Sequence, residues 1–250
     1  MNNHASKLAR AFGKTPAFMP FIMGGDPDLP TTEKLLHALH QAGVALIEIG
    51  IPFSDPVAEG ATIEAAATRA LTNGCTVDKL FNLIARAKKD IPIPLLFRTY
   101  YNPIFVYGAA KFARRCVECG IEGLIVPDLP LEEMSELREA LNGTVVLIPL
   151  LATASPTRAK KIAAAAEGFV YCLSTANETT THTLAEIKKA RHIPCVVSVD
   201  ATDAEEIKRT ASVADGVAVS NAIVELVATH GQACVAPVAA LMAEVKASTK

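Results

Sequence analysis

The sequence lacks the long charged runs and long apolar runs that mark several classes of protein. Its 250 residues include 24 basic and 26 acidic side chains, with no basic cluster that would neutralise a phosphate backbone. No stretch reaches the roughly 18 apolar residues that a membrane-spanning helix needs, and residues 1–14 lack the apolar centre of a secretory signal. We therefore expect a soluble, cytoplasmic protein with no nucleic-acid or membrane partner.

The sequence also lacks the spacings of metal sites and of familiar catalytic triads. Its six cysteines are scattered singly, except for Cys116 and Cys119, and no second pair or histidine cluster accompanies these two. We interpret the cysteines as reduced thiols. No Ser-His-Asp or Cys-His order stands out, and His182, the one histidine near a predicted active-site loop, is interpreted as a surface residue.

Eight near-continuous apolar runs are present, which is the pattern of strands buried on both faces of a parallel sheet. Amphipathic stretches of helical period lie between them, and several of these end on glycine. The predicted strands are Ala17–Met23, Ala45–Ile51, Pro94–Tyr101, Gly123–Pro127, Val145–Leu151, Gly168–Leu173, Pro194–Val199 and Gly216–Val219.

This alternation of strands and helices predicts an α/β fold, a single (β/α)8 TIM barrel. A chain of 250 residues that is 50% apolar can bury one large core, so we predict one domain over residues 1–250. An open doubly wound sheet is the alternative. The absence of a glycine-rich GxGxxG motif after the first strand, together with the eight repeated units, favours the barrel.

In such barrels the chemistry is carried by the loops that follow the strands, so long loops are informative. The two longest segments of this kind are Pro52–Thr76, after the second predicted strand, and the polar stretch Ser174–Thr183, after the sixth. We predict that these two segments form the active-site loops.

Charged side chains occur at two of the apolar runs. Glu48 lies within the second, where burial of a carboxylate costs free energy unless a charge, hydrogen bonds or a function retains it. Its pKa is expected to be raised, which suits a general acid or base. Glu59 follows in the long loop, and two carboxylates in different environments can divide an acid/base task. Arg98 in the third run should pair with a carboxylate or an anion, or extend outward to solvent.

Phosphate is a common ligand of barrels, held by backbone amides after the seventh and eighth strands. The candidates here are Ser220 and Asn221, which open a predicted helix, although Asn221 has an equally good interpretation as a plain helix cap. Asp200 follows the seventh strand and places a negative charge toward the same end of the barrel.

Four motifs occur in the order and spacing of one family. They are PFIMGGDP at Pro20–Pro27, IEIGIPFSDPVAEG at Ile47–Gly60, TYYNPIFVYG at Thr99–Gly108 and GLIVPDLPLEE at Gly123–Glu133. The chain thereby resembles the α subunit of tryptophan synthase through nearly its whole length.

The resemblance implies a lyase that cleaves indole-3-glycerol phosphate to indole and glyceraldehyde 3-phosphate without a cofactor. It places the catalytic proton donor and base on Glu48 and a second acid, which contacts the indole nitrogen, on Glu59. Phe21 and Tyr171 match positions that line the substrate pocket, and Asp128 matches an acid near the mouth. It also implies a β subunit that carries pyridoxal phosphate, in an α2β2 heterotetramer.

The chain departs from the family at the expected phosphate site. Thr179 matches the threonine that the family has in the loop after the sixth strand. The expected substrate contacts are Thr179, Ser220 and Asn221. However, Thr180, Asp200 and Ser220 stand at positions where the family has glycine, and Arg98 stands at a normally apolar pocket position. Two interpretations remain open: a working lyase, and an impaired α subunit that mainly binds and allosterically activates its β subunit.

Overall fold

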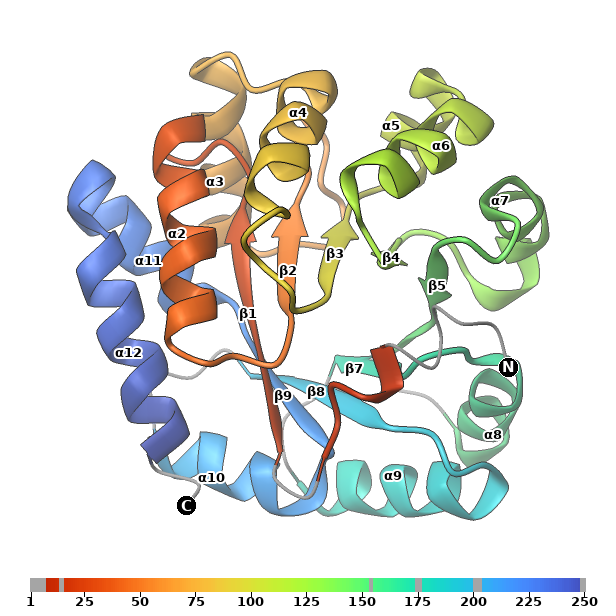
Figure 1. The fold of residues 1–250 in the computed structure, drawn as a ribbon. Coiled ribbons are helices and arrows are strands. Elements are labelled where there is room, and N and C mark those ends of the chain that lie inside the picture. The colour runs from red at the N-terminus through yellow and green to blue at the C-terminus, as the bar shows by residue number, and fades with distance from the viewer. Residues whose placement is uncertain (1–7, 14–15, 153–154, 174–176, 200–203, 248–250) are drawn as a thin grey trace.

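The computed structural model describes residues 8–13, 16–152, 155–173, 177–199 and 204–247. Within these residues, nine parallel strands form a nearly closed barrel with helices around it (Figure 1). The predicted TIM barrel is thus confirmed. The strands are β1 (Ala17–Met23), β2 (Ile47–Gly50), β3 (Leu95–Arg98), β4 (Gly123–Ile125), β5 (Val146–Ile148), β6 (Leu150–Leu151), β7 (Val170–Leu173), β8 (Cys195–Val199) and β9 (Gly216–Val219).

The strand order is β5-β4-β3-β2-β1-β9-β8-β7-β6, so the two ends of the sheet are consecutive in the chain. The structure has two strands, β5 and β6, where the sequence predicted the single strand Val145–Leu151, so that prediction was wrong. Only Pro149 separates the two strands. The physical reason is that proline has no N–H to donate to a strand ladder. The Pro149 carbonyl still accepts the Tyr171 N–H at 3.1 Å, which ties the break to β7.

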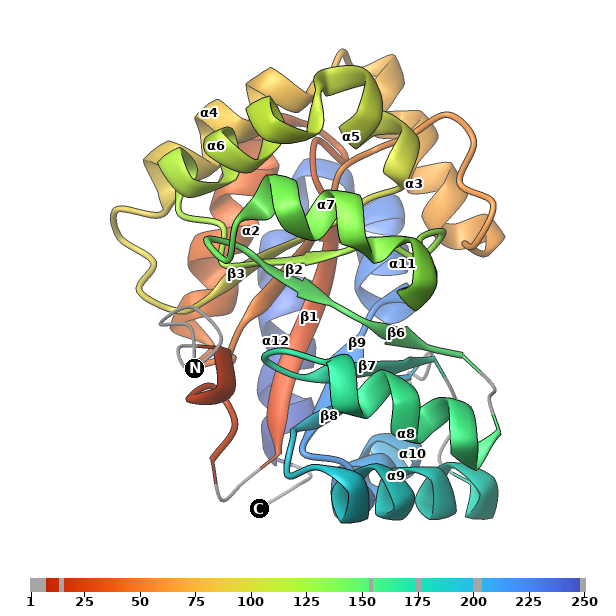
Figure 2. The same cartoon turned by 90° about the vertical axis from the view of Figure 1, so that its right-hand side faces the viewer.

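Helices surround the strands on the outside of the barrel. Figure 2 shows α4, α5 and α6 together on one side of the strands and α8, α9 and α10 on the opposite side. The helices are α2 (Leu29–Gln41), α3 (Ala61–Thr72), α4 (Val77–Ala87), α5 (Tyr101–Tyr107), α6 (Ala109–Cys119), α7 (Met134–Leu141), α8 (Pro156–Ala165), α9 (Glu178–Ala190), α10 (Ala204–Val213), α11 (Asn221–His230) and α12 (Val235–Ala247), with short 3-10 helices η1 (Leu131–Glu133) and η2 (Gly231–Ala233). In the part of the chain described, none of these helices is long and apolar enough to cross a membrane.

Helices occupy more of the two predicted loops than the sequence indicated. Helix α3 takes up the middle of Pro52–Thr76, which leaves residues 52–60 as the loop after β2. Helix α9 begins at Glu178, so most of Ser174–Thr183 is helical. The Asn177 side chain caps this helix by accepting the Thr180 N–H at 2.9 Å, which satisfies one of the free donors at a helix start.

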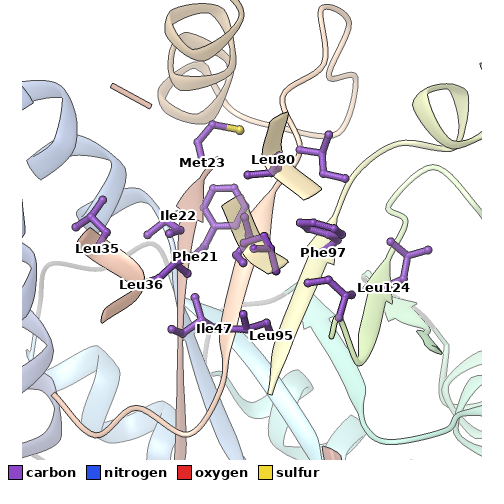
Figure 3. Close-up of a cluster of buried hydrophobic side chains, with 14 of the residues drawn as sticks. Phe21, Ile22, Met23, Leu35, Leu36, Ile47, Leu80, Leu95, Phe97 and Leu124 are labelled. Carbon is purple, nitrogen blue, oxygen red and sulfur yellow. The ribbon is translucent and has the colours of Figure 1, made fainter. Parts of the chain in front are cut away.

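Alternation along the strands divides the core into two layers, because successive strand residues point to opposite faces. Outside the barrel, Ile22 of β1 and Phe97 of β3 lie in the layer toward the helices, with Leu36 and Leu80 (Figure 3). Inside the barrel, a second cluster contains side chains from most strands: Met19, Leu46, Leu96, Ile125, Ile148, Tyr171, Val196 and Ala218. The inward positions two residues further along each strand are polar: Glu48 follows Leu46, Arg98 follows Leu96 and Ser220 follows Ala218. These side chains belong to the site described below.

Candidate active site

The candidate site lies inside the barrel at the carboxyl ends of its strands. Strand register brings it together, since Phe21 of β1 pairs with Glu48 of β2, and Gly50 of β2 pairs with Arg98 of β3. Inward-facing residues at the C-terminal end of a barrel are where TIM-barrel enzymes carry their chemistry. Glu48, Arg98 and Tyr171 are all buried there.

Arg98 bridges the two carboxylates that the sequence singled out. Its Nη1 lies 3.3 Å from Glu48 Oε1, and its Nη2 lies 2.7 Å from Glu59 Oε1. The guanidinium also lies over the Phe21 ring, 5.3 Å from the ring centre. The Arg98 side chain is only 7% exposed and that of Glu48 is 0% exposed, so solvent screens these interactions little. Of the possibilities left open for Arg98, pairing with carboxylates is the one the structure shows.

Tyr171 contacts Glu48 from the opposite part of the barrel. Its hydroxyl donates to Glu48 Oε2 at 3.3 Å, and it also hydrogen-bonds with the Ser198 side chain. Burial raises the pKa of Tyr171 above its ordinary value, as does the charge of Glu48, so the hydroxyl remains a proton donor. Glu48 is therefore held at both oxygens, by Arg98 on one side and by Tyr171 on the other.

The electrostatics of Glu48 reflect opposing effects. Burial raises its pKa, the positive charge of Arg98 lowers it, the negative charge of Glu59 raises it, and the net direction is upward. For Arg98, burial acts to lower the pKa, but the charges around it, of which that of Glu48 is the largest, raise it, so the guanidinium stays charged. A carboxylate with a raised pKa can both donate and accept a proton near neutral pH, which is the behaviour expected of a general acid/base.

The loop of residues 52–60 brings Glu59 to the site. Its Ala58 N–H donates to the Tyr100 hydroxyl at 3.0 Å, next to the Arg98 to Glu59 ion pair. Burial raises the pKa of Tyr100 to about 12. Gly50 at the end of β2 has a steric role, because a Cβ there would lie 2.7 Å from Phe21 Cζ. The glycine therefore leaves room for the Phe21 ring that lies under Arg98.

The free space at the site is small. The cavity beside Arg98 and Glu59 has a volume of about 20 Å³, which is room for about one water molecule. Its wall includes Phe21, Phe53 and Tyr100. Among the described residues, no group of three or more His, Cys, Asp and Glu side chains lies where it would hold a metal ion.

The residues predicted to bind phosphate lie at the end of β9 and at the starts of helices α11 and α9. Ser220 is buried at the end of β9, and its Oγ has no hydrogen-bond partner within the described structure. Asn221 is half-buried and is the first residue of α11. Thr179 is exposed in the first turn of α9, whereas Thr180 is buried and its hydroxyl hydrogen-bonds with Asn177. Asp200 lies outside the described residues.

Some contacts at this end of the barrel were not anticipated from the sequence. Ser198 and Tyr100 were not singled out, although both contact residues of the site. For Ser198, a polar residue at an inward position of the run Pro194–Val199 was a usable signal. Asp128 does not reach the carboxylates in any described contact, and instead accepts the N–H of Tyr101 at the start of α5, at 2.9 Å.

The chain is similar to known proteins in sequence and in fold. Residues 8–250 match the sequence model of the family described as tryptophan synthase alpha chain. A tryptophan synthase alpha chain from Bacillus cereus (strain AH820) is 38% identical over 221 residues, which cover 84% of this chain and 86% of the relative.

Solved structures give the same result. Tryptophan synthase subunit alpha from Legionella pneumophila str. Paris superposes with a TM-score of 0.90 at 30% identity, covering 100% of this chain and 98% of that one. A chain of the tryptophan synthase complex from Pyrococcus furiosus superposes with a TM-score of 0.87 at 29% identity, covering 94% and 99%. The family match and the curated relative together establish that the chain belongs to the tryptophan synthase alpha chain family.

Proposed function

We propose that the chain catalyses the cleavage of indole-3-glycerol phosphate to indole and glyceraldehyde 3-phosphate, with Glu48 and Glu59 as its catalytic residues. The observation that carries the proposal is that these two carboxylates, eleven positions apart in the chain, meet on one guanidinium inside the barrel. Their environments differ in degree, since Glu48 comes from a strand and its side chain is 0% exposed, while Glu59 comes from a loop and its side chain is 6% exposed. Such a difference separates the roles of two acids.

The reaction is a retro-aldol cleavage. Glu48 donates a proton to C3 of the indole ring, and the positive charge that develops on the ring nitrogen is stabilised by the carboxylate of Glu59. Glu48, which is a carboxylate after this donation, then accepts the proton of the hydroxyl on the adjacent side-chain carbon, and that carbon becomes the aldehyde. The bond between that carbon and C3 breaks, and its electron pair returns to the ring to restore indole. No redox step or cofactor in this chain is required.

In the same proposal, Phe21 and Tyr171 flank the reacting part of the substrate. Ser220 and Asn221 hold its phosphate at the start of α11, where free backbone N–H groups and the helix dipole favour an anion. The buried and unpartnered Ser220 hydroxyl supports this assignment. Thr179 is proposed to add a further contact from the start of α9.

We also propose a pyridoxal-phosphate-containing β subunit as partner, in an α2β2 heterotetramer in the cytoplasm. Exposed apolar side chains at the mouth of the barrel support a protein partner: Val57 on the loop after β2 is 82% exposed, and Phe105 and Val106 on α5 are 64% and 77% exposed. All six cysteines are buried free thiols, which agrees with a reducing compartment.

The test is release of glyceraldehyde 3-phosphate from indole-3-glycerol phosphate by the purified chain, alone and with a β subunit, together with β activity on indole and serine. We expect release in both samples and faster release in the complex. Absence of release with β activity raised by the chain would contradict the lyase and indicate an allosteric activator instead.

A further inference from the structure

We propose that Arg98 is a displaceable clamp: its guanidinium holds Glu48 and Glu59 in the substrate-free site and leaves the space between them when substrate enters. This proposal rests on the proposed lyase function, and it adds a positioning residue that controls access to the two acids. Four observations carry it, namely the double ion pair of Arg98, its contact with Phe21, the small cavity beside it and its unpartnered Nε.

The guanidinium of Arg98 occupies the space that the substrate ring needs. A ring that is protonated by Glu48 and contacted by Glu59 must lie between the two carboxylates. The Arg98 guanidinium lies there, because its two terminal nitrogens contact one carboxylate each. The cavity next to Arg98 and Glu59, of about 20 Å³, admits roughly one water and cannot take an indole ring. A ring in contact with both carboxylates and the observed position of Arg98 therefore exclude each other.

The ion pairs of Arg98 can be exchanged for contacts with the substrate. A buried ion pair gains coulombic energy but loses the hydration of both groups, so its net contribution is often small. Arg98 Nε has no hydrogen-bond partner in the described structure, which leaves part of that lost hydration uncompensated. An indole N–H can replace the guanidinium at Glu59, and an indole ring can replace it on the face of Phe21. The exchange of guanidinium for substrate therefore preserves a hydrogen bond and an aromatic contact.

Displacement of Arg98 also changes the pKa of Glu48. The positive charge of Arg98 is the main influence that lowers the Glu48 pKa against the effect of burial. When the guanidinium leaves, its positive charge no longer opposes burial and the charge of Glu59, so the Glu48 pKa rises further. Entry of the substrate thus favours the protonated form of Glu48, which is the form that the cleavage needs.

The test uses the fact that the chain contains no tryptophan, so that an added indole can be followed by its own fluorescence. The probe is indole-3-propanol phosphate, which lacks the side-chain hydroxyl required for cleavage. We compare the natural chain with Arg98→Leu. The matched control is Arg86→Leu, because Arg86 makes an exposed ion pair with Glu33 between α4 and α2.

Removal of a clamp that competes with the ligand should lower the Kd of the probe about tenfold or more in Arg98→Leu and leave it unchanged in Arg86→Leu. A loss of structure cannot produce tighter binding. Unchanged or weaker binding by a folded Arg98→Leu variant would overturn the clamp.

A crystal structure of the natural chain with the probe provides a measurement that does not depend on the variant. We expect the guanidinium to be out of hydrogen-bonding distance of at least one carboxylate, and a guanidinium still on both would overturn the clamp. If the natural chain cleaves substrate but Arg98→Leu binds the probe no better, the clamp alone fails. If neither protein binds the probe or cleaves substrate, the proposed function fails, and the clamp with it.

Discussion

The protonation of Glu48 depends on three neighbours that act in different directions. Burial and Glu59 raise its pKa, while Arg98 and the hydrogen bond from Tyr171 lower it. Each neighbour can be changed separately, so the balance is open to measurement by pH profiles of cleavage.

Tyr171→Phe should move the pH profile of cleavage to higher pH. The variant loses the hydroxyl that donates to Glu48 Oε2 at 3.3 Å, and with it one of the influences that lower the Glu48 pKa. The ring itself remains, so the barrel interior keeps its packing. The measurement is kcat against pH, with Tyr107→Phe as the control, because Tyr107 hydrogen-bonds with Asp78 away from the acids. A profile that stays in place, or moves to lower pH, would contradict the role given to Tyr171.

Glu48→Gln should abolish cleavage and also change how stability depends on pH. The pKa of Glu48 is raised above 4.5 in the folded chain, so between 4.5 and the raised value the folded state binds more protons than the unfolded state. Stability is therefore lost as the pH rises through this window. Glutamine does not titrate, so the stability of the variant relative to that of the natural chain should increase as the pH rises through this window. Urea unfolding at several pH values measures this, and a stability difference that does not vary with pH would argue against it.

At the site, the sequence predicted individual residues better than their contacts. The sequence singles out Glu48 because a carboxylate inside an apolar run needs a charged or hydrogen-bonding partner. The structure shows that Arg98 and Tyr171 are these partners. The pairing of Arg98 with Glu59 was not predictable. It depends on the path of residues 52–60, and that loop has no periodicity from which a path can be read.

Among the elements, helix α9 shows how a polar side chain can fix a boundary. The Asn177 side chain accepts the Thr180 N–H at 2.9 Å, and Asn177→Ala should destabilise the fold by about 1 kcal/mol, as loss of a helix cap typically does. Chemical denaturation measures the change. His182→Ala, an exposed substitution within the same helix, is the control and should have little effect. Equal stability of Asn177→Ala and the natural chain would contradict a stabilising role for this helix cap.

All eight predicted apolar runs contain strands, because burial on both faces of a sheet leaves a clear pattern. Their ends were less predictable. The second run, Ala45–Ile51, forms a ladder only over Ile47–Gly50, since hydrophobicity does not show where hydrogen bonding stops. The polar start of α9 has the sequence pattern of a loop, because threonine and asparagine are typical of loops as well as of helix starts.

For the molecule as a whole, the proposed assembly can be tested by mass. The exposed apolar residues Val57, Phe105 and Val106 lie on the loops and helix that follow two neighbouring strands, β2 and β3. We expect a mixture with a β subunit to run as α2β2 in native mass measurement, and Phe105→Glu to weaken it by placing a charge in an apolar contact. Free α and β in the natural mixture would count against the heterotetramer.

The neighbour of β1 on one side is β9, and Ala17 pairs with Gly216 across nearly the whole length of the chain. A ribosome that adds about 5 to 20 residues per second needs on the order of 10 to 40 seconds between these two strands. During that time the nascent chain presents β1 with an unpaired edge, which is the kind of surface that chaperones bind and that aggregates recruit. Completion of the ring therefore waits until β9 has been synthesised, and a truncated message that lacks this strand should yield an aggregation-prone product.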